Sequence, residues 1–287
     1  ERDKFNMLQD TTFFVNVDYL LSPSKKTFIQ QYTYRIHPTT DNCPFFFQFV
    51  RFNAIPKLIS SIGKGNIPFL DIGYLLIILT FIQIVIIAAI FILLPLLFKK
   101  WESKNKKWVF IYFSGLGLAY MFLEMVFIQQ FTFYFGEPTY ATALTLSILL
   151  FTSGLGSYYS GMVQNNNKVR YVLPIIIATI LILYAITLSP ILTSTIGLAL
   201  PFKILISVIL LGILGFLLGM PFPLGVNYLS EKNNQDIPWG WAFNGYFSVI
   251  STVLATIIFV EVGYLSLFII AAFLYALVGI SNRWLKI

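Results

Sequence analysis

The chain has 287 residues, of which 57% are hydrophobic and only 11% are charged, against roughly 25% charged residues in ordinary soluble domains. This composition, with a mean hydropathy of +0.80, excludes collagen, coiled coils, disulfide scaffolds, disordered chains and secreted soluble enzymes, and it predicts an integral membrane protein. The formal net charge is +7, but the basic residues flank apolar runs in short clusters. We therefore interpret them as topology signals and expect no nucleic-acid partner.

Cysteine and histidine are each present once, as Cys43 and His37. One cysteine cannot form an intrachain disulfide or a thiolate cluster, and one histidine cannot provide a bis-histidine haem site. We expect no metal site and no redox cofactor in this chain.

The first 72 residues contain no candidate span and are predicted to form a short mixed, partly interfacial N-terminal segment. The chain begins at Glu1 without a signal peptide, which suggests a fragment of a longer protein. Alternating stretches at 12–17 and 30–36 predict short strands. The aromatic and basic stretch 45–62 has the composition of a segment in the membrane interface, and a strand followed by a linker is the alternative.

Residues 73–287 carry closely spaced apolar runs, which predict an all-α polytopic domain with about seven transmembrane helices. The first run would reach about 39 Å at ~1.5 Å per residue, enough to cross a hydrocarbon core of ~30 Å. The expected spans, in chain order, are 73–98, 108–130, 141–163, 171–188, 202–226, 241–262 and 265–280. The expected connections include a short aromatic turn at 131–140, a proline-containing loop at 189–201 and a longer polar loop at 227–240.

The distribution of lysine and arginine predicts the orientation. Seven spans place ten of these residues on the side of the C-terminus and four on the other side. The positive-inside rule therefore predicts a multi-pass protein of the cell (inner) membrane with a cytoplasmic C-terminus and with residues 1–72 outside.

Glu124 lies near the middle of the second expected span, where an ionisable group costs roughly 2.5–3.5 kcal/mol on insertion scales. Such a group usually faces protein or a water-filled cavity, which makes Glu124 the leading functional candidate. Gly117 and Tyr120 share its helix face at helical spacing, so a neighbouring helix could approach there. The carboxyl is interpreted either as a protonated structural group with hydrogen bonds or as part of a proton relay or catalytic site.

Small residues four apart predict helix-packing faces in the third and fifth spans. A phosphate-binding glycine loop would need a strand-to-helix turn and a flanking lysine, and neither is present. The predicted packing residues are Gly117, Gly154, Gly156, Ser157, Gly161, Gly215 and Gly219.

Two prolines, Pro221 and Pro223, interrupt the end of the fifth span. Proline removes backbone donors, so the segment either ends the helix, which is our default interpretation, or forms a broken helix that lines a binding site. Asn244 enters the next span as a polar group that needs a partner.

Several stretches together resemble the C-terminal half of bacterial integral membrane proteins of the spermidine synthase-like, S-adenosylmethionine-dependent methyltransferase superfamily. They are TTDNCPFFFQFVR (39–51), FSGLGLAYMFLEMVFIQQFTFYFGEPTYA (113–141), LFTSGLGSYYSG (150–161), GMPFPLG (219–225) and PWGWAFNGYFSVISTVLA (238–255). The resemblance implies that the spans follow a Rossmann-like domain, of which residues 1–72 would be the tail or remnant. Asn42 departs from the family pattern, which has a second acidic residue there.

The resemblance also implies that the nucleotide donor would bind upstream of Glu1, because no Gly-x-Gly-x-x-Gly occurs in residues 1–72. We therefore expect no cofactor in this chain, and a SAM-type nucleotide only if an upstream domain exists. A cytosolic donor would require that domain inside the cell, whereas the basic residues place residues 1–72 outside. This conflict argues against an enzyme; if the whole protein is one, the resemblance implies an aminopropyl- or methyltransferase.

Three functions follow from the sequence. The first is a non-catalytic membrane domain that anchors or assists an upstream domain or a neighbouring membrane complex, with membrane lipids and membrane proteins as partners. The second is a transferase module that presents a lipidic or amphiphilic substrate along a path lined by Glu124, Glu137 and Asn244. The third is a small-solute or proton-coupled transporter that uses Glu124 and the broken segment, although no internal repeat supports it.

Overall fold

The computed structural model describes residues 12–32, 34–45, 48–51, 54, 56, 72–98, 100–163 and 167–282. Two compact units divide the chain, Glu1–Leu76 and Ile77–Ile287, and each is described by itself.

The N-terminal unit contains two short helices, α2 (Thr12–Leu21) and α3 (Lys25–Gln31). The guanidinium group of Arg51 donates hydrogen bonds to the carbonyl oxygens of Ile29 and Gln30 at 2.9 and 2.7 Å, and so satisfies two acceptors in the last turn of α3. Two isolated bridges, Tyr34 with Val50 and Thr40 with Cys43, are the extended pairings among the described residues.

The strands predicted at 12–17 and 30–36 are wrong. The first stretch lies in α2, and the second begins in the last residues of α3. Six alternating residues cannot distinguish a strand from a helix, because the apolar residues near 13, 17 and 20 also recur with the helical period. Most of the predicted interfacial stretch 45–62 lies outside the described residues.

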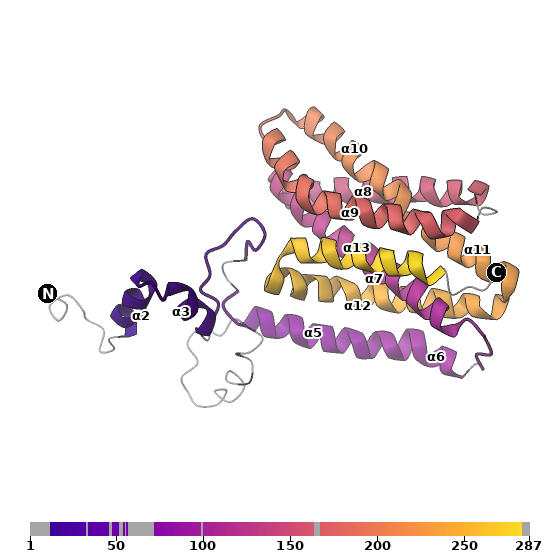
Figure 1. Cartoon of the computed structure of the whole chain (residues 1–287), viewed down its shortest axis with the longest axis horizontal. Coiled ribbons are helices and arrows are strands. Elements are labelled where there is room, and N and C mark those ends of the chain that lie inside the picture. Colours follow the sequence, from indigo (N-terminus) through magenta and orange to yellow (C-terminus); the bar gives the residue numbers. More distant parts are fainter. Residues whose placement is uncertain are drawn as a thin grey trace. The chain divides into compact units, whose positions relative to one another are not determined.

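The predicted all-α, seven-span architecture is confirmed: among the described residues, seven helical segments are long and apolar enough to cross a membrane. Figure 1 shows them as a bundle of long helices. The first span consists of α5 (Ile72–Ala88), a π-helical turn η2 (Ala89–Leu93) and α6 (Leu94–Leu97). The others are α7 (Lys106–Phe135), α8 (Pro138–Val163), α9 (Asn167–Thr195), α10 (Leu200–Leu218) with α11 (Pro221–Lys232), α12 (Ile237–Val262) and α13 (Tyr264–Ser281).

The helices extend further than the sequence predicts, because helical hydrogen bonding continues where the chain leaves the apolar core. The expected turn at 131–140 shrinks to Gly136 and Glu137, since α7 runs to Phe135 and ends on Gly136 in the left-handed conformation (φ 76°). The expected loop at 189–201 is wrong in its first half, because α9 continues through Pro190 to Thr195. Most of the expected polar loop at 227–240 is helical as well, in α11, the 3₁₀ turn η3 (Asn234–Asp236) and the start of α12.

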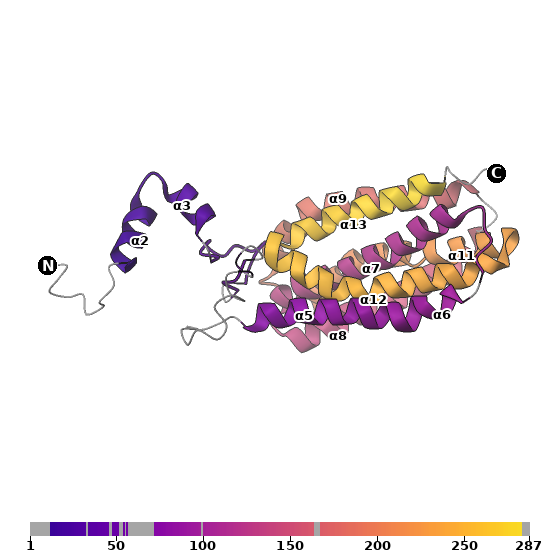
Figure 2. The same cartoon turned by 90° about the horizontal axis from the view of Figure 1, so that it is seen from below.

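Helix α7 lies at the centre of the helical unit and packs against α8, α12 and α13. Its buried side chains include seven aromatic ones, and the rings of Phe113 and Phe127 meet rings of α11 and α13 edge to face. Helix α13 packs on α7 and α9, and α8 packs on α10. Figure 2 shows α7 among its neighbours, with α5 along the outside of α12.

The connection between α12 and α13 is a single residue, Gly263, with φ 99° and ψ 170°. Its amide donates to the carbonyl oxygens of Ile258 and Phe259. A side chain is strained at this φ, which explains a glycine between two otherwise apolar helices.

Candidate functional site

The fifth span is broken near its middle. Helix α10 ends at Leu218, Gly219 and Met220 form the junction, and α11 begins with Pro221, where a missing amide hydrogen costs least. The hydroxyl of Tyr112 on α7 donates to the carbonyl oxygen of Pro221 at 2.7 Å, in a buried position. Both Pro221 and Pro223 therefore lie in the first turn of a new helix, and the chain continues as a broken helix beyond the point where we expected it to end.

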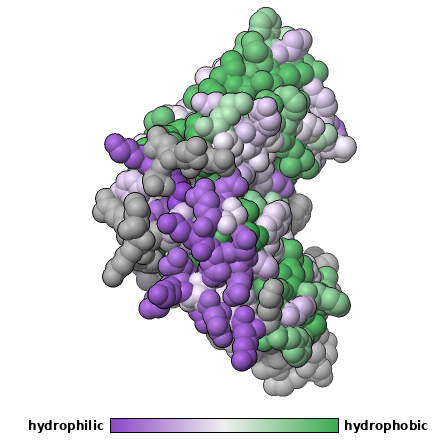
Figure 3. All heavy atoms as spheres, turned by 90° about the vertical axis from the view of Figure 1, so that its right-hand side faces the viewer, coloured by the Kyte–Doolittle hydropathy of each residue, from purple (hydrophilic) through white to green (hydrophobic). Residues whose placement is uncertain are grey.

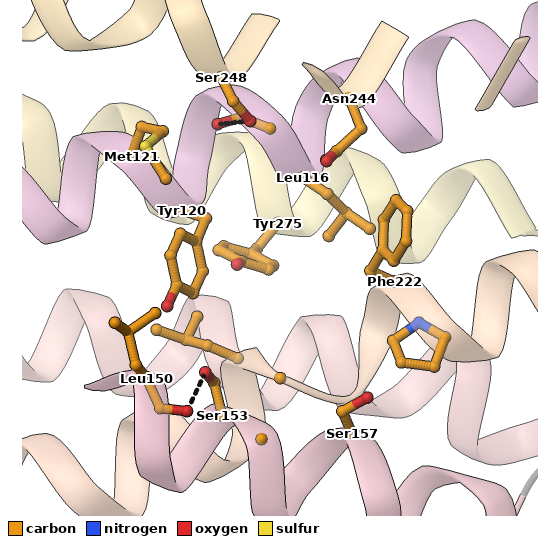
Figure 4. Close-up of a pocket in the computed structure, with 15 residues that line it drawn as sticks. Leu116, Tyr120, Met121, Leu150, Ser153, Ser157, Phe222, Asn244, Ser248 and Tyr275 are labelled. Carbon is orange, nitrogen blue, oxygen red and sulfur yellow. Dashed lines mark hydrogen bonds between the residues drawn. The ribbon is translucent and has the colours of Figure 1, made fainter. Parts of the chain in front are cut away.

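A cavity of about 400 Å³ lies beside this break. Figure 4 shows that side chains from α7, α8, α11, α12 and α13 converge on it. Its lining residues are Leu116, Gly117, Tyr120, Met121, Leu150, Ser153, Gly154, Ser157, Leu218, Gly219, Phe222, Pro223, Asn244, Ser248 and Tyr275.

Polar residues on α12 join this helix to α7 at the cavity wall. Asn244 donates from Nδ2 to the carbonyl oxygen of Phe113 at 3.3 Å, and Ser248 donates from Oγ to that of Gly117 at 3.4 Å. These bonds join α12 to α7, and glycine at 117 permits the approach, because a Cβ there would collide with the Asn244 carbonyl. On α8, Ser153 donates to the carbonyl oxygen of Leu150 at 3.2 Å.

Two tyrosines form the middle of the cavity wall. Tyr120 on α7 directs its hydroxyl toward Ser153, and the ring of Tyr275 from α13 lies beside it (Figure 4). The side chain of Tyr275 is 1% exposed, yet it borders the cavity. The wall therefore presents hydroxyl and amide groups within an otherwise apolar surface.

The two glutamates that were predicted to have a function lie away from the cavity lining. Glu124 is half-buried one turn along α7 from Tyr120, and its carboxyl makes no hydrogen bond with the described residues. Glu137 is exposed in the connection between α7 and α8. Of the path proposed from Glu124, Glu137 and Asn244, the structure places Asn244 in the cavity wall.

The predicted packing residues divide into two groups. Gly156 and Gly215 lie where α8 and α10 touch, and a Cβ on either would collide with Phe216 or Thr152. Gly154 borders the cavity and Gly161 is exposed, and a Cβ on either meets nothing within 4 Å.

A polar contact at the basic end of the bundle was not predicted. The carboxylate of Asp236 is 1% exposed and accepts hydrogen bonds from Trp101 Nε1 and Ser103 Oγ, both at 2.7 Å. Trp101 also stacks on Trp239 with ring centroids 4.3 Å apart. These contacts fix the α6–α7 connection to the start of α12. An acidic residue before a helix beginning with Ile-Pro-Trp was the available sequence signal.

Figure 3 shows hydrophilic side chains gathered at this end of the helical unit. The exposed polar residues in its connections and helix ends include Lys100, Glu102, Lys104, Lys106, Lys107, Lys168, Glu231, Lys232, Asn234 and Gln235. Buried nearby, the Arg170 guanidinium lies over the ring of Tyr228, 4.3 Å from its centroid.

Comparisons with known protein families, with curated proteins and with solved structures find no match for the chain. In the described part of the chain, no group of three or more histidine, cysteine, aspartate and glutamate side chains is placed to hold a metal ion. The resemblance to spermidine synthase-like proteins stays a prediction.

Proposed function

We propose that the helical unit is a non-catalytic membrane module that takes up an amphiphilic molecule from the bilayer and anchors a larger assembly. The observation that carries this proposal is the cavity beside the broken fifth span, with an uncharged polar lining inside an apolar bundle. In the proposed arrangement the C-terminus is cytoplasmic in the inner membrane, and the bound molecule is presented to a partner protein or to an upstream domain of a spermidine synthase-like chain.

Access from the bilayer supports this proposal. The wall formed by α8 is open, because the side chain of Leu150 is 61% exposed and Gly154 and Ser157 are exposed as well. A membrane-soluble molecule can therefore reach the cavity without crossing the packed interior of α7, α12 and α13.

The chemistry of the lining favours binding over catalysis or ion transport. The cavity is bordered by hydroxyl, amide and apolar side chains, and neither Glu124 nor Glu137 is part of its wall. A proton-coupled transporter would place an ionisable group in the solute path, and a transferase would need a donor site that residues 1–72 do not carry.

The test is to fill the cavity. Gly154→Leu places a side chain in open space at the cavity wall, whereas Gly161→Leu makes the same substitution on the same helix, also in open space, away from the lining. Amphiphiles that copurify with each protein would be extracted and quantified by mass spectrometry. We expect Gly154→Leu to lose roughly tenfold of one amphiphile, with Gly161→Leu like the wild type. Equal amounts in all three proteins would refute the proposed function.

A further inference from the structure

Tyr275 is a hydrogen-bond donor directed at the cavity. Its side chain is 1% exposed and borders the cavity, and its hydroxyl makes no hydrogen bond with the described residues. A hydroxyl that has lost most of its hydration gains free energy when it finds a hydrogen-bond partner. A molecule in the cavity that offers an acceptor oxygen would supply the missing partner.

Two neighbouring polar groups already donate hydrogen bonds to the protein. The Asn244 amide and the Ser248 hydroxyl donate to backbone carbonyls of α7. They fix the shape of the wall, whereas Tyr275 has a donor to offer. A ligand group that matches this donor is an acceptor such as a carbonyl oxygen.

The depth of the site restricts the ligand to uncharged molecules. Tyr120 lies 14 residues after Lys106 and 15 before Phe135, at mid-length of α7 and about 21 Å from either end at ~1.5 Å per residue. A charged phospholipid head group stays in the interface, because a charge at the bilayer centre is costly. The lining offers no lysine, arginine, histidine, aspartate or glutamate to compensate such a charge.

The apolar part of the wall suits a small ring or a short ester with a long tail. Leu116, Met121 and Phe222 surround the polar groups, and the volume of about 400 Å³ lies within the ~300–1,000 Å³ usual for small-molecule sites. The tail would leave past the exposed side chain of Leu150 into lipid.

We infer that the cavity binds the uncharged, carbonyl-bearing head group of a membrane-soluble amphiphile, whose carbonyl oxygen accepts a hydrogen bond from Tyr275. This inference rests on the proposed function and specifies its ligand. Two sources share the chemistry: the ring of an isoprenoid quinone and the ester of a neutral glycerolipid.

The experiment uses three probes on the full chain in detergent: a decyl-substituted benzoquinone, dioctanoylglycerol and decylbenzene, which has a tail and a ring but no carbonyl. Dissociation constants come from the shift of the melting temperature with probe concentration. We expect at least one carbonyl probe to bind the wild type roughly tenfold more tightly than decylbenzene does. Tyr275→Phe should weaken that probe roughly 3- to 10-fold and leave decylbenzene unchanged.

Tyr264→Phe is the matched control, since Tyr264 is buried on the same helix and does not border the cavity. It should leave all three affinities unchanged. If Tyr275→Phe lowers the melting temperature without ligand, the test depends on the wild-type chain alone. It then compares the affinities of the two carbonyl probes with that of decylbenzene.

The possible failures are distinguishable. Equal binding of decylbenzene and both carbonyl probes, all blocked by Gly154→Leu, would overturn the carbonyl inference and leave the proposed function standing. Absence of binding by every probe, together with no copurifying amphiphile, would overturn both. Binding of one carbonyl probe in a Tyr275-dependent way identifies the source.

Discussion

The two faces of α8 use the same kind of residue for opposite purposes. On one face Gly156 lies so close to α10 that a Cβ would collide with the backbone carbonyl of Phe216. On the other face a Cβ at Gly154 meets nothing within 4 Å, and Ser157 is exposed. One face is closed by a neighbouring backbone and the other borders the cavity.

This difference shows that a small residue in a membrane helix permits a second helix to approach closely but does not cause that approach. Helix association in lipid depends on backbone contact and hydrogen bonds, because lipid tails are as apolar as leucine. Gly156 has α10 beside it, whereas Gly154 faces the space between α8 and α12. The element beside the glycine therefore determines whether it serves helix packing or borders a binding site.

The sharpest test of this difference is the same substitution on both faces. Gly156→Ala should lower the free energy of unfolding by about 2–3 kcal/mol, because backbone atoms of Phe216 cannot rotate away from the added Cβ. Thermal or denaturant unfolding in detergent would measure the change.

Gly154→Ala is the matched control on the cavity face. Its Cβ enters open space and alanine is the better helix former, so stability should stay the same or rise by up to about 1 kcal/mol. Equal losses from both substitutions would contradict the distinction between the two faces.

Asp236 tests whether contacts at the end of the bundle stabilise the position of α12, which forms one wall of the cavity. Asp236→Ala leaves the Trp101 indole and the Ser103 hydroxyl without their acceptor, so unfolding should cost about 2 kcal/mol less. Asp236→Asn keeps one acceptor oxygen, so its free energy of unfolding should fall by roughly half as much. Fluorescence of Trp101 and its stacked neighbour Trp239 would report the freed connection. An unchanged melting temperature and spectrum would show that α12 is placed without this contact.

Tyr112 tests the end wall, where α11 begins. Tyr112→Phe keeps the buried ring and removes the hydrogen bond to the Pro221 carbonyl, for an expected loss of about 1 kcal/mol. Tyr159→Phe on α8, where the ring is 44% exposed, should change stability by less than about 0.5 kcal/mol. If both variants melt alike, the helix break does not depend on Tyr112.

Cys43 tests which side of the membrane the N-terminal unit occupies, with no expected effect on stability. It is the one cysteine of the chain, so a membrane-impermeant maleimide applied to intact spheroplasts reports its location directly. The positive-inside rule predicts labelling. In a Cys43→Ser background, Lys104→Cys should label only after the membrane is opened. The reverse pattern would place the N-terminal unit in the cytoplasm and favour a cytosolic donor domain.

The number and order of the spans could be predicted because about 20 apolar residues in a row have few alternatives to a membrane helix. The helix ends could not be predicted, since polar residues such as Asn227 and Lys232 continue α11 once lipid no longer restricts them. The N-terminal helices were missed because short alternating stretches satisfy both helical and strand periods.

Part of the cavity was visible in the sequence, because Tyr120, Asn244 and Pro223 each break an apolar pattern. Tyr275 was missed, since a single tyrosine in an apolar run is ordinary and periodicity does not reveal that α13 packs on α7. The two glutamates attracted attention by charge alone, whereas the cavity depends on which helices meet.

Gly263 has a consequence for how this bundle is made. One residue separates α12 from α13. The connection is therefore too short to form a polar loop in water before the second helix is inserted. An unsatisfied backbone cannot remain in hydrocarbon, and a turn this tight forms with both helices beside it. We therefore expect the last two spans to enter the bilayer together as one hairpin, so that the wall with Asn244 and the helix with Tyr275 are inserted as a pair.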